Sequence, residues 1–270
     1  MAQHHELLRA ALLAAARATD LIRRAVRPEP KAWGRKGPHD FVTDVDRAAE
    51  RLIGETLMDA VPHSVVLGEE FTPELRSDAP ITWVVDPLDG TTNFLHDYPM
   101  YAVSIAAVIA GEPVAGVVSD VTRGCTYQAT AGDGAWCDGR RLRVTRLTDP
   151  GRALLGTGFP FKAPASAQLD AYLDQFRRIL PCTSGVRRGG SAALDLAHVA
   201  EGRLDGFWEF GLSAWDIAAG ILLVREAGGR VTDFAGRPLP VAAGDVVAGG
   251  PGVHAWLLGM LTPGADGAPA

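Results

Sequence analysis

Acidic residues follow an apolar run in the first half of the chain. Residues 81–85 read Ile-Thr-Trp-Val-Val, and this run without polar alternation predicts a buried strand. Asp86 ends the run, Pro87 fixes a turn, and Asp89 returns a second carboxylate beside the first. Two hard oxygen donors at a strand end suit Mg²⁺, which takes few protein carboxylates and keeps several waters. The segment predicts a magnesium site, although Asp-Pro and Asp-Gly alone are also common turn formers.

A phosphate-binding segment is predicted directly after these carboxylates. Gly90, Thr91 and Thr92 are small residues that open a predicted helix, whose first N–H groups are free to bind an anion. Hydrolysis of a phosphate monoester depends mainly on charge neutralisation, and metal ions can also activate the attacking water. The sequence contains no His-Glu-x-x-His motif or serine elbow, and metal-assisted hydrolysis requires no covalent nucleophile.

Three more carboxylates stand where they could join the same site. Glu69 follows the predicted strand 64–67, Asp216 lies in an otherwise apolar predicted helix, and Asp46 lies near the start of a predicted helix over 45–60. Each also has a plain structural interpretation. Glu69 could be a surface residue, and the two aspartates could simply cap their helices. Taken singly, these residues leave both interpretations open.

Taken in order, these motifs resemble those of the inositol monophosphatase family of lithium-sensitive, magnesium-dependent phosphatases. The resemblance extends over roughly residues 5–260. The segments that carry it are residues 40–43, 68–70, 86–91, 188–194 and 215–220.

The resemblance implies two Mg²⁺ ions, with a third and weaker ion near Glu69. Glu69, Asp86 and the main-chain carbonyl of Leu88 are implied to hold the first ion. Asp86, Asp89 and Asp216 are implied to hold the second. Glu69 therefore counts among both the catalytic residues and the metal ligands.

The resemblance also implies roles toward water and substrate. Asp46 and Thr91 are expected to orient and deprotonate the attacking water, and Thr91 also belongs to the phosphate cradle with Gly90 and Thr92. The residues expected to contact the substrate are Gly90, Thr91, Thr92, Ala192, Glu209 and Asp216. Lys36 lies in the segment that resembles a mobile lid.

The fold expected from the resemblance is a layered α/β sandwich of the sugar-phosphatase class, in which helix and sheet layers alternate. We expect a single domain over residues 1–262 with two closely packed halves, about 1–148 and 149–262, and a flexible tail over 263–270. Predicted helices cover 5–27, 45–60, 166–179, 191–201 and 213–227. Predicted strands cover 64–67, 81–85, 101–109, 113–121, 125–130, 153–157, 204–208 and 231–232, and the strands between 101 and 130 are expected to form an antiparallel meander. The run at 140–143 is expected to be a solvated strand edge, and 31–40 an exposed loop.

Composition restricts the partners of the protein. The 270 residues carry a formal net charge of −6, which disfavours nucleic acid and anionic membranes as partners. The three cysteines are widely spaced and predict reduced thiols in a cytoplasmic protein. Charged residues flank the short apolar run at 12–16 on both sides and no basic leader precedes it, which argues against a secretory signal. The family resemblance implies a homodimer.

The substrate is the least constrained inference. Glu209 favours a polyol such as inositol 1-phosphate, because a carboxylate accepts hydrogen bonds from ring hydroxyls. The same scaffold also serves fructose 1,6-bisphosphate, histidinol phosphate and phosphoadenosine phosphate, and the apolar segment 156–161 leaves strict inositol specificity open. A non-enzymatic regulatory or scaffold protein is the alternative from another class.

Overall fold

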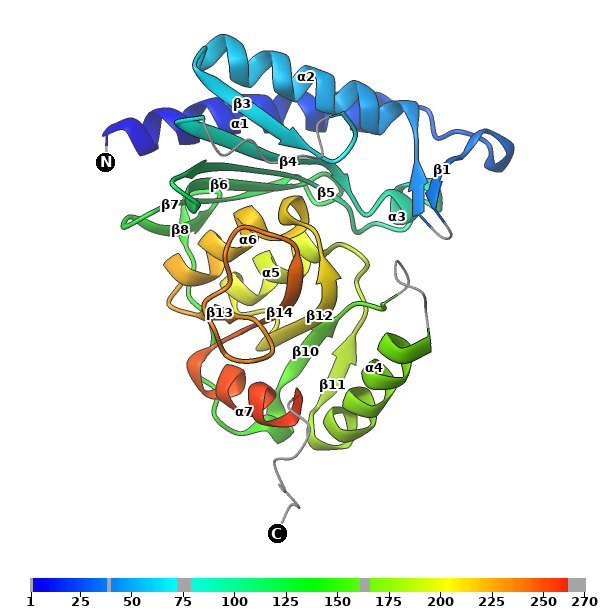
Figure 1. The fold of residues 1–270 in the computed structure, drawn as a ribbon, viewed down its shortest axis with the longest axis vertical. Coiled ribbons are helices and arrows are strands. Elements are labelled where there is room, and N and C mark those ends of the chain that lie inside the picture. Colours follow the sequence, from blue (N-terminus) through cyan, green and yellow to red (C-terminus); the bar gives the residue numbers. More distant parts are fainter. Residues whose placement is uncertain (1, 38–39, 72–78, 161–165, 262–270) are drawn as a thin grey trace.

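The computed structural model describes residues 2–37, 40–71, 79–160 and 166–261. Its helices and sheets alternate in five layers (Figure 1). The outer helices α1 (Ala2–Arg24) and α2 (Asp44–Ala60) cover one face of a seven-stranded sheet. Helices α5 (Ala192–Glu201) and α6 (Ala214–Glu226) separate this sheet from a five-stranded sheet. The layered α/β prediction is therefore confirmed.

The seven-stranded sheet has the strand order β3-β4-β5-β6-β7-β8-β9. Only β3 and β4 are parallel, and the following strands form the predicted antiparallel meander. The strands are β3 (Ser64–Gly68), β4 (Ile81–Asp89), β5 (Ala102–Ile109), β6 (Glu112–Asp120), β7 (Cys125–Thr130), β8 (Gly134–Cys137) and β9 (Arg140–Arg141). Both arginines of β9 are exposed at the sheet edge, as the polar run at 140–143 predicts.

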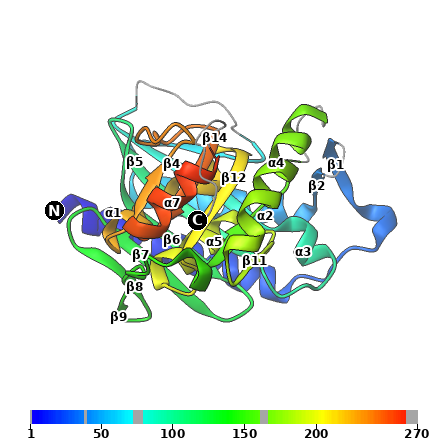
Figure 2. The same cartoon turned by 90° about the horizontal axis from the view of Figure 1, so that it is seen from below.

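The five-stranded sheet has the order β11-β10-β12-β14-β13. Its strands are β10 (Leu154–Thr157), β11 (Gly185–Arg187), β12 (Gly206–Leu212), β13 (Arg230–Thr232) and β14 (Gly244–Gly249). Helices α4 (Ser166–Ile179) and α7 (Pro251–Leu261) form the outermost layer beyond this sheet (Figure 2). Short 3-10 helices cover Pro30–Ala32, Pro150–Arg152 and Leu180–Cys182.

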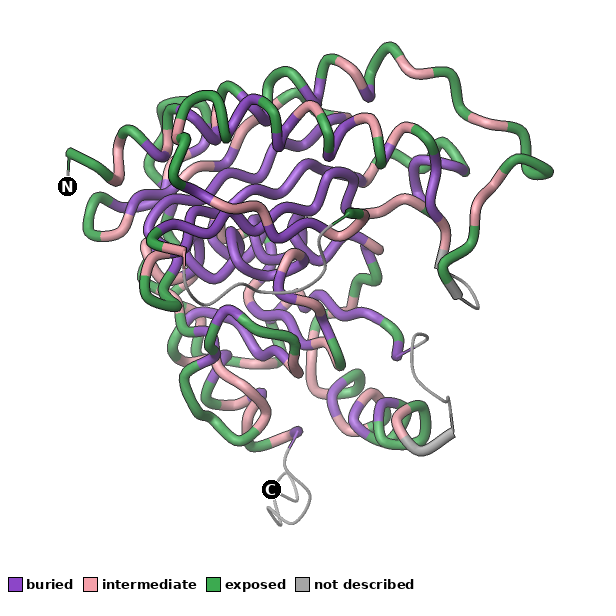
Figure 3. Tube along the Cα trace, turned by 45° about the horizontal axis from the view of Figure 1, so that its top comes forward, coloured by how far each residue is buried: buried purple, intermediate pink, exposed green. Residues whose placement is uncertain are grey.

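Helix composition follows the layers. α1 and α2 each bury one apolar stripe and expose a polar one, because only one side faces the sheet (Figure 3). α5 and α6 are buried on nearly all sides, which suits helices between two sheets. Gly116 of β6 allows the close approach of α6, since an added Cβ would lie 3.2 Å from the Ala219 Cα. This contact fixes the height of α6, and hence of Asp216, above the sheet.

Two local predictions are wrong. Residues 31–40 are not simply a loop, because β1 (Gly34–Gly37) pairs with β2 (Asp40–Val42) in an antiparallel hairpin. The chain also does not leave the sheet at Asp86, because β4 continues to Asp89 with a register irregularity. In both places a nearby Gly or Pro indicates a turn. Pairing with another strand, β2 for β1 and β5 for β4, keeps the segment in a sheet instead.

Several elements were not predicted from the sequence: β8, β11, β14 and α7. The strands are short or rich in glycine, and α7 is apolar on most sides, so none carries a strong periodic pattern. Within the described residues, no helix combines the length and apolarity that crossing a bilayer requires. The division into two packed halves stays a prediction, and the tail at 263–270 lies outside the described residues.

Candidate active site

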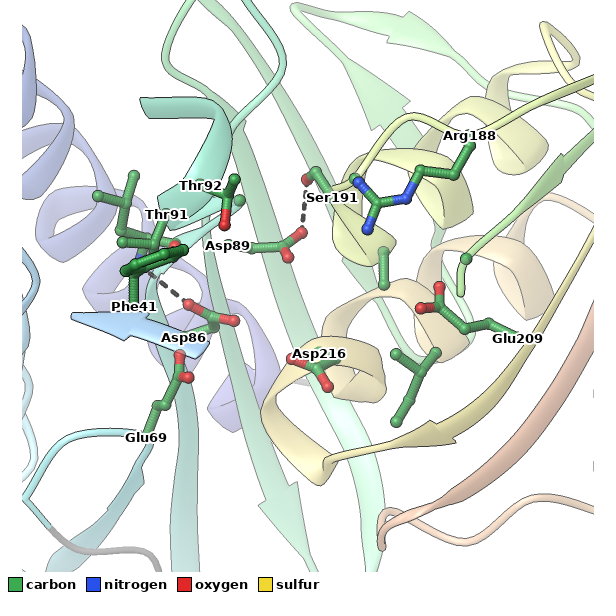
Figure 4. Close-up of a pocket in the computed structure, with 16 residues that line it drawn as sticks. Phe41, Glu69, Asp86, Asp89, Thr91, Thr92, Arg188, Ser191, Glu209 and Asp216 are labelled. Carbon is green, nitrogen blue, oxygen red and sulfur yellow. Dashed lines mark hydrogen bonds between the residues drawn. The ribbon is translucent and has the colours of Figure 1, made fainter. Parts of the chain in front are cut away.

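Three carboxylates from distant parts of the sequence meet between the two sheets. Asp86 and Asp89 lie at the end of β4, and Asp216 lies in the first turn of α6. One oxygen from each lies within 4.8 Å of the others, and all three residues are buried (Figure 4). Asp216, from the motif at 215–220, thus joins the two aspartates of the motif at 86–91, as the sequence predicts.

A bulge in β4 aims the first two carboxylates at the same place. Asp86 pairs with Ser104 and Asp89 with Ala102, so three steps on β4 match two on β5 (Ala102–Ile109). In a regular strand, residues 86 and 89 would point to opposite faces of the sheet. The extra residue changes this alternation, as β-bulges next to functional sites commonly do. The Asp86 Oδ1 also accepts a hydrogen bond from the Leu88 N–H at 3.0 Å.

Burial and mutual repulsion make it costly for these carboxylates to be ionised without a counter-charge. Burial raises the pKa of Asp86 well above its ordinary value, and the charges of Glu69, Asp89 and Asp216 raise it further. Burial and then Asp216 raise the pKa of Asp89 to about 7. A bound cation would offset both costs. The available donors are carboxylate oxygens and the Leu88 carbonyl, an all-oxygen set that suits a hard divalent ion.

Thr91 and Asp46 form a hydrogen-bonded pair beside this cluster. The Thr91 hydroxyl lies 2.8 Å from Asp46 Oδ1 and 3.1 Å from the Leu88 carbonyl oxygen. The other oxygen of Asp46, Oδ2, accepts the Thr43 N–H at 2.9 Å and so caps α2. Burial raises the pKa of Asp46. The capping interpretation and the functional interpretation of Asp46 are therefore compatible, because each uses a different oxygen.

The carboxylates belong to a pocket of about 300 Å³. Ten of the predicted residues line it: Glu69, Asp86, Leu88, Asp89, Gly90, Thr91, Thr92, Ala192, Glu209 and Asp216. Asp46 lies behind Thr91, and Lys36 contacts a lining residue from β1. Gly90 has a φ of 96° and an added Cβ would lie 3.0 Å from the Met100 carbonyl oxygen, so the turn before α3 (Thr91–Leu95) requires glycine.

The opposite wall contains two residues that the sequence prediction missed. Ser191 donates its hydroxyl to Asp89 Oδ2, which also accepts the Ala193 N–H at 2.8 Å. Asp89 is thereby tied to the start of α5. Arg188 is the one basic residue among the described lining residues, and its guanidinium lies 5.0 Å from the Phe159 ring centroid. Both residues fall in the motif at 188–194. The sequence feature that could have identified them is a basic residue followed directly by small residues, a pattern that suits an anion-binding loop.

Glu209 enters the pocket past a glycine. A Cβ at Gly158 would lie 1.8 Å from Glu209 Oε1, so this position must lack a side chain for Glu209 to keep its place. Glu209 lies on β12 and Asp216 on α6, which follows directly, and both line the pocket. The predicted strand-to-helix turn between them is confirmed. The importance of Gly158 shows only in three dimensions.

Glu50 positions the segment that carries Glu69. Its two carboxylate oxygens accept the Glu70 N–H at 2.7 Å and the Phe71 N–H at 2.9 Å. Gly68 makes room for this carboxylate, since a Cβ there would lie 2.1 Å from Glu50 Oε1. Sequence analysis missed Glu50, because one buried acid in the apolar stripe of a helix gives no motif.

Lys36 contacts both neighbouring carboxylates. Its Nζ lies 2.9 Å from Glu69 Oε1 and also bonds Glu70. Burial lowers the pKa of Lys36, but the two carboxylates raise it by more, so the amine stays charged. The predicted lid residue thus lies beside a predicted metal ligand.

Comparison with known proteins decides the family. The model of the inositol monophosphatase family matches residues 3–262. The chain belongs to the inositol monophosphatase family.

Two family relatives are similar over nearly their whole length. "Nus factor SuhB" of Pseudomonas aeruginosa is 47% identical over 260 residues, which cover 95% of this chain and 96% of the relative. The crystal structure of extragenic suppressor protein suhB from Bartonella henselae is 39% identical, with a TM-score of 0.88, and the match covers 96% of this chain and 99% of that one.

A third similar protein is named for its activity. The inositol monophosphatase from Anabaena is 36% identical, with a TM-score of 0.82 and 94% of each chain covered. Its fold therefore agrees with the layered architecture of this inositol monophosphatase family member.

Proposed function

We propose that this protein hydrolyses the phosphate monoester of a small polyol in a reaction that requires Mg²⁺, and that inositol 1-phosphate is its substrate. The observation that carries the proposal is the buried cluster of Asp86, Asp89 and Asp216, with ligand oxygens within 4.8 Å of one another. Membership of the inositol monophosphatase family supports a phosphatase.

In this proposal the carboxylates hold the ions. Glu69, Asp86 and the Leu88 carbonyl hold one Mg²⁺. Asp86, Asp89 and Asp216 hold a second. A third, weaker ion binds near Glu69. When bound, Mg²⁺ neutralises the phosphate oxygens and lowers the pKa of water.

The remaining residues orient the reactants. The Thr91 hydroxyl donates to Asp46, so the Thr91 oxygen can accept a hydrogen bond from the attacking water. This hydrogen bond aims a lone pair of the water at phosphorus. Asp46, whose pKa is raised by burial, accepts the proton. Gly90, Thr91 and Thr92 hold the phosphate, and Arg188 adds a positive charge from the opposite wall.

Glu209 and Ala192 define the alcohol side of the pocket. A carboxylate accepts hydrogen bonds from ring hydroxyls, which favours a polyol over a flat or apolar leaving group. The name of the Anabaena relative supports inositol monophosphate as the substrate. Fructose 1,6-bisphosphate, histidinol phosphate and phosphoadenosine phosphate are the competing substrates on this scaffold.

A phosphate-release assay over these four substrates and an aryl phosphate tests the proposal. We expect turnover that is fastest on inositol 1-phosphate, requires Mg²⁺ and ends in excess chelator. Asp86→Asn, Asp89→Asn and Asp216→Asn should each reduce kcat by at least about a hundredfold, because each removes an anionic ligand. Asp59→Asn, an exposed aspartate on α2, is the control. Full activity in chelator would overturn the proposal.

Three further properties complete the proposal. Li⁺ should inhibit by taking the second ion's place beside Asp86, Asp89 and Asp216, the protein should be a homodimer, and it should act in the cytoplasm. Turnover unaffected by Li⁺ in the millimolar range or above, or a monomer in sedimentation analysis, would contradict the respective property.

A regulatory role is the second candidate function. It is favoured by the name "Nus factor SuhB" of the Pseudomonas aeruginosa relative. If this role is separate from catalysis, the Asp89→Asn variant should release no phosphate, yet its gene should restore the growth of a strain that lacks the wild-type gene. If only the active protein restores growth, the regulatory role depends on hydrolysis.

A further inference from the structure

Two cysteines and an aspartate meet at the β7–β8 hairpin, outside the active-site pocket. Cys125 begins β7, Cys137 ends β8, and Asp138 follows in the turn to β9. Across the sheet, Asp89 of β4 pairs with Ala102 of β5, Ala102 with Asp120 of β6, and Asp120 with Cys125 of β7. Cys125 is therefore three strands away from Asp89, or roughly 14 Å at a strand spacing of about 4.8 Å. None of the three residues lines the active-site pocket. This cluster therefore has to be explained separately from phosphate hydrolysis.

The spacing of the ligand atoms suits a small tetrahedral ion. The two Sγ atoms and one carboxylate oxygen of Asp138 all lie within 4.8 Å of one another. Cys137 Sγ lies 3.9 Å from Asp138 Oδ2. Bonds from Zn²⁺ of about 2.3 Å to sulfur and 2.1 Å to oxygen place tetrahedral ligand atoms about 3.6 Å apart. Since no two of the atoms are more than 4.8 Å apart, shifts of at most about 1 Å would let one ion reach all three.

The hairpin holds Asp138 with one oxygen toward the sulfurs. Asp138 Oδ1 accepts the Thr126 N–H at 3.1 Å, which leaves Oδ2 on the side of Cys137. Asp138 and Gly139 both have positive φ, 47° and 81°, as the two central residues of a tight hairpin turn require. A hydrogen bond to the non-ligating oxygen of a carboxylate is the usual way that proteins orient a metal ligand.

Exposure leaves one side of the cluster open. Cys137 is buried, Cys125 is half-buried and Asp138 is exposed, so an ion can enter from solvent and keep a water as its fourth ligand. The nearby guanidinium groups of Arg140 and Arg203 both pair with Glu201. Glu201 therefore offsets one of these two positive charges, and the Asp138 carboxylate stands against the other.

We propose that Cys125, Cys137 and Asp138 form a second metal site, which binds a thiophilic divalent cation such as Zn²⁺. Two sulfur ligands discriminate against Mg²⁺, which prefers oxygen, so this site and the active site would hold different ions in one protein. Each thiol loses its proton on binding, and affinity should therefore increase with pH.

A disulfide between the two cysteines is the competing interpretation. Cys137 pairs with Tyr127 across the hairpin, so Cys125 is its diagonal neighbour and not its direct partner. Diagonal positions lie farther apart than directly opposed ones, and disulfides need closely approaching Cβ atoms. A metal ion tolerates this offset because it stands between the sulfurs.

Titration of the full-length protein with Co²⁺, under a non-chelating reductant and saturating Mg²⁺, tests the site. Thiolate ligation of Co²⁺ gives a near-ultraviolet charge-transfer band, which carboxylate ligation at the active site does not give. We expect one equivalent of Co²⁺ to produce the band and Zn²⁺ to displace it. Cys182→Ser, which removes the remote third cysteine, should leave the band unchanged.

Variants of each ligand complete the test. Cys125→Ser and Cys137→Ser should abolish the band, and Asp138→Asn should weaken Co²⁺ binding by about tenfold or more. Cys125 is half-buried, so its variant should fold even if Cys137→Ser does not. Absence of the band in wild type, its loss only in Cys182→Ser, or a Cys125–Cys137 disulfide that resists the reductant would overturn the proposal.

Discussion

At the scale of single residues, two aspartates of the site each serve more than one purpose. Asp46 caps α2 with one oxygen and accepts the Thr91 hydroxyl with the other. Asp216 accepts the Ser213 N–H at 2.7 Å at the start of α6 while its carboxylate belongs to the acidic cluster. Helix capping thus fixes the rotamers of two residues on which the proposed chemistry depends.

The first prediction at this scale concerns Thr91. Thr91→Val should keep the side-chain shape and lower kcat by about 10- to 100-fold with little change in KM, because the hydroxyl orients the attacking water. Steady-state kinetics on inositol 1-phosphate measure the effect, and Thr91→Ser, which keeps the hydroxyl, should retain most of the activity. A change confined to KM would show that Thr91 only holds substrate.

Glu209 gives a prediction about selectivity. A carboxylate hydrogen bond to a hydroxyl contributes roughly 1.5–3 kcal/mol, so Glu209→Gln should reduce kcat/KM about 10- to 100-fold on inositol 1-phosphate. An aryl phosphate without ring hydroxyls should lose little. Gly158→Ala should have a similar effect, because its methyl group would occupy the place of the Glu209 carboxylate.

Equal losses on the two substrates, together with a lower melting temperature, would make Glu209 a structural residue. Arg188 and Lys36 are the two basic residues that could hold Glu209 in such a role. Lys36 contacts Glu69 and Glu70, whereas Arg188 lines the same pocket as Glu209.

At the scale of elements, the strand ends are held by contacts from neighbouring helices. Glu50 of α2 binds two backbone N–H groups just after β3, and α5 binds Asp89 at the end of β4 through Ser191 and Ala193. A small displacement of either helix would therefore move a predicted metal ligand.

The prediction at this scale is that Glu50→Gln weakens Mg²⁺ activation. Its amide can accept only at one oxygen, so one of the two N–H groups after Glu69 loses its partner. We expect the Mg²⁺ concentration for half-maximal activity to rise about 10- to 100-fold, as for other residues that orient metal ligands. Glu55→Gln, on the exposed side of the same helix, is the matched control. Unchanged activation in Glu50→Gln would show that Glu69 holds its place unaided.

At the scale of the whole molecule, α5 packs a buried histidine against the seven-stranded sheet. His198 of α5 packs edge-on against Tyr127 of β7, with ring centroids 6.3 Å apart, and its Nε2 lies 3.4 Å from the Arg123 guanidinium. Burial, and then Arg123, lower the pKa of His198 to about 4. The folded protein therefore holds this imidazole neutral between the two layers.

This arrangement predicts a loss of stability in mild acid. The unfolded chain protonates His198 near pH 6.5, whereas the folded protein resists protonation until about pH 4. Above pH 6.5 His198 does not reduce the free energy of unfolding. As the pH falls from 6.5 toward 4, the free energy of unfolding decreases by up to about 3 kcal/mol because only the unfolded chain takes up the proton. Urea unfolding of wild type and His198→Gln at pH 7 and pH 4.5 measures it. The variant should lose less stability between the two pH values, and equal losses would contradict the assignment.

Local sequence patterns predict the acidic motifs, the main helices and the antiparallel meander. These features follow from local chemistry: apolar periodicity marks the elements, and small residues next to carboxylates mark the ends of strands. The order of motifs also determined the family, since residues 86–91 and 215–220 both match it.

Which side chains meet, and how they are held, depends on contacts between distant segments. The bulge that aims Asp89 arises from pairing with β5, and the need for glycine at 158 arises from Glu209 on a different strand. Glu50, Ser191 and Arg188 act through contacts between segments far apart in the chain, which no local pattern encodes. The same holds for the cysteine cluster. The spacing of Cys125 and Cys137 in the sequence predicts separate thiols, and only strand pairing brings their sulfur atoms together with Asp138.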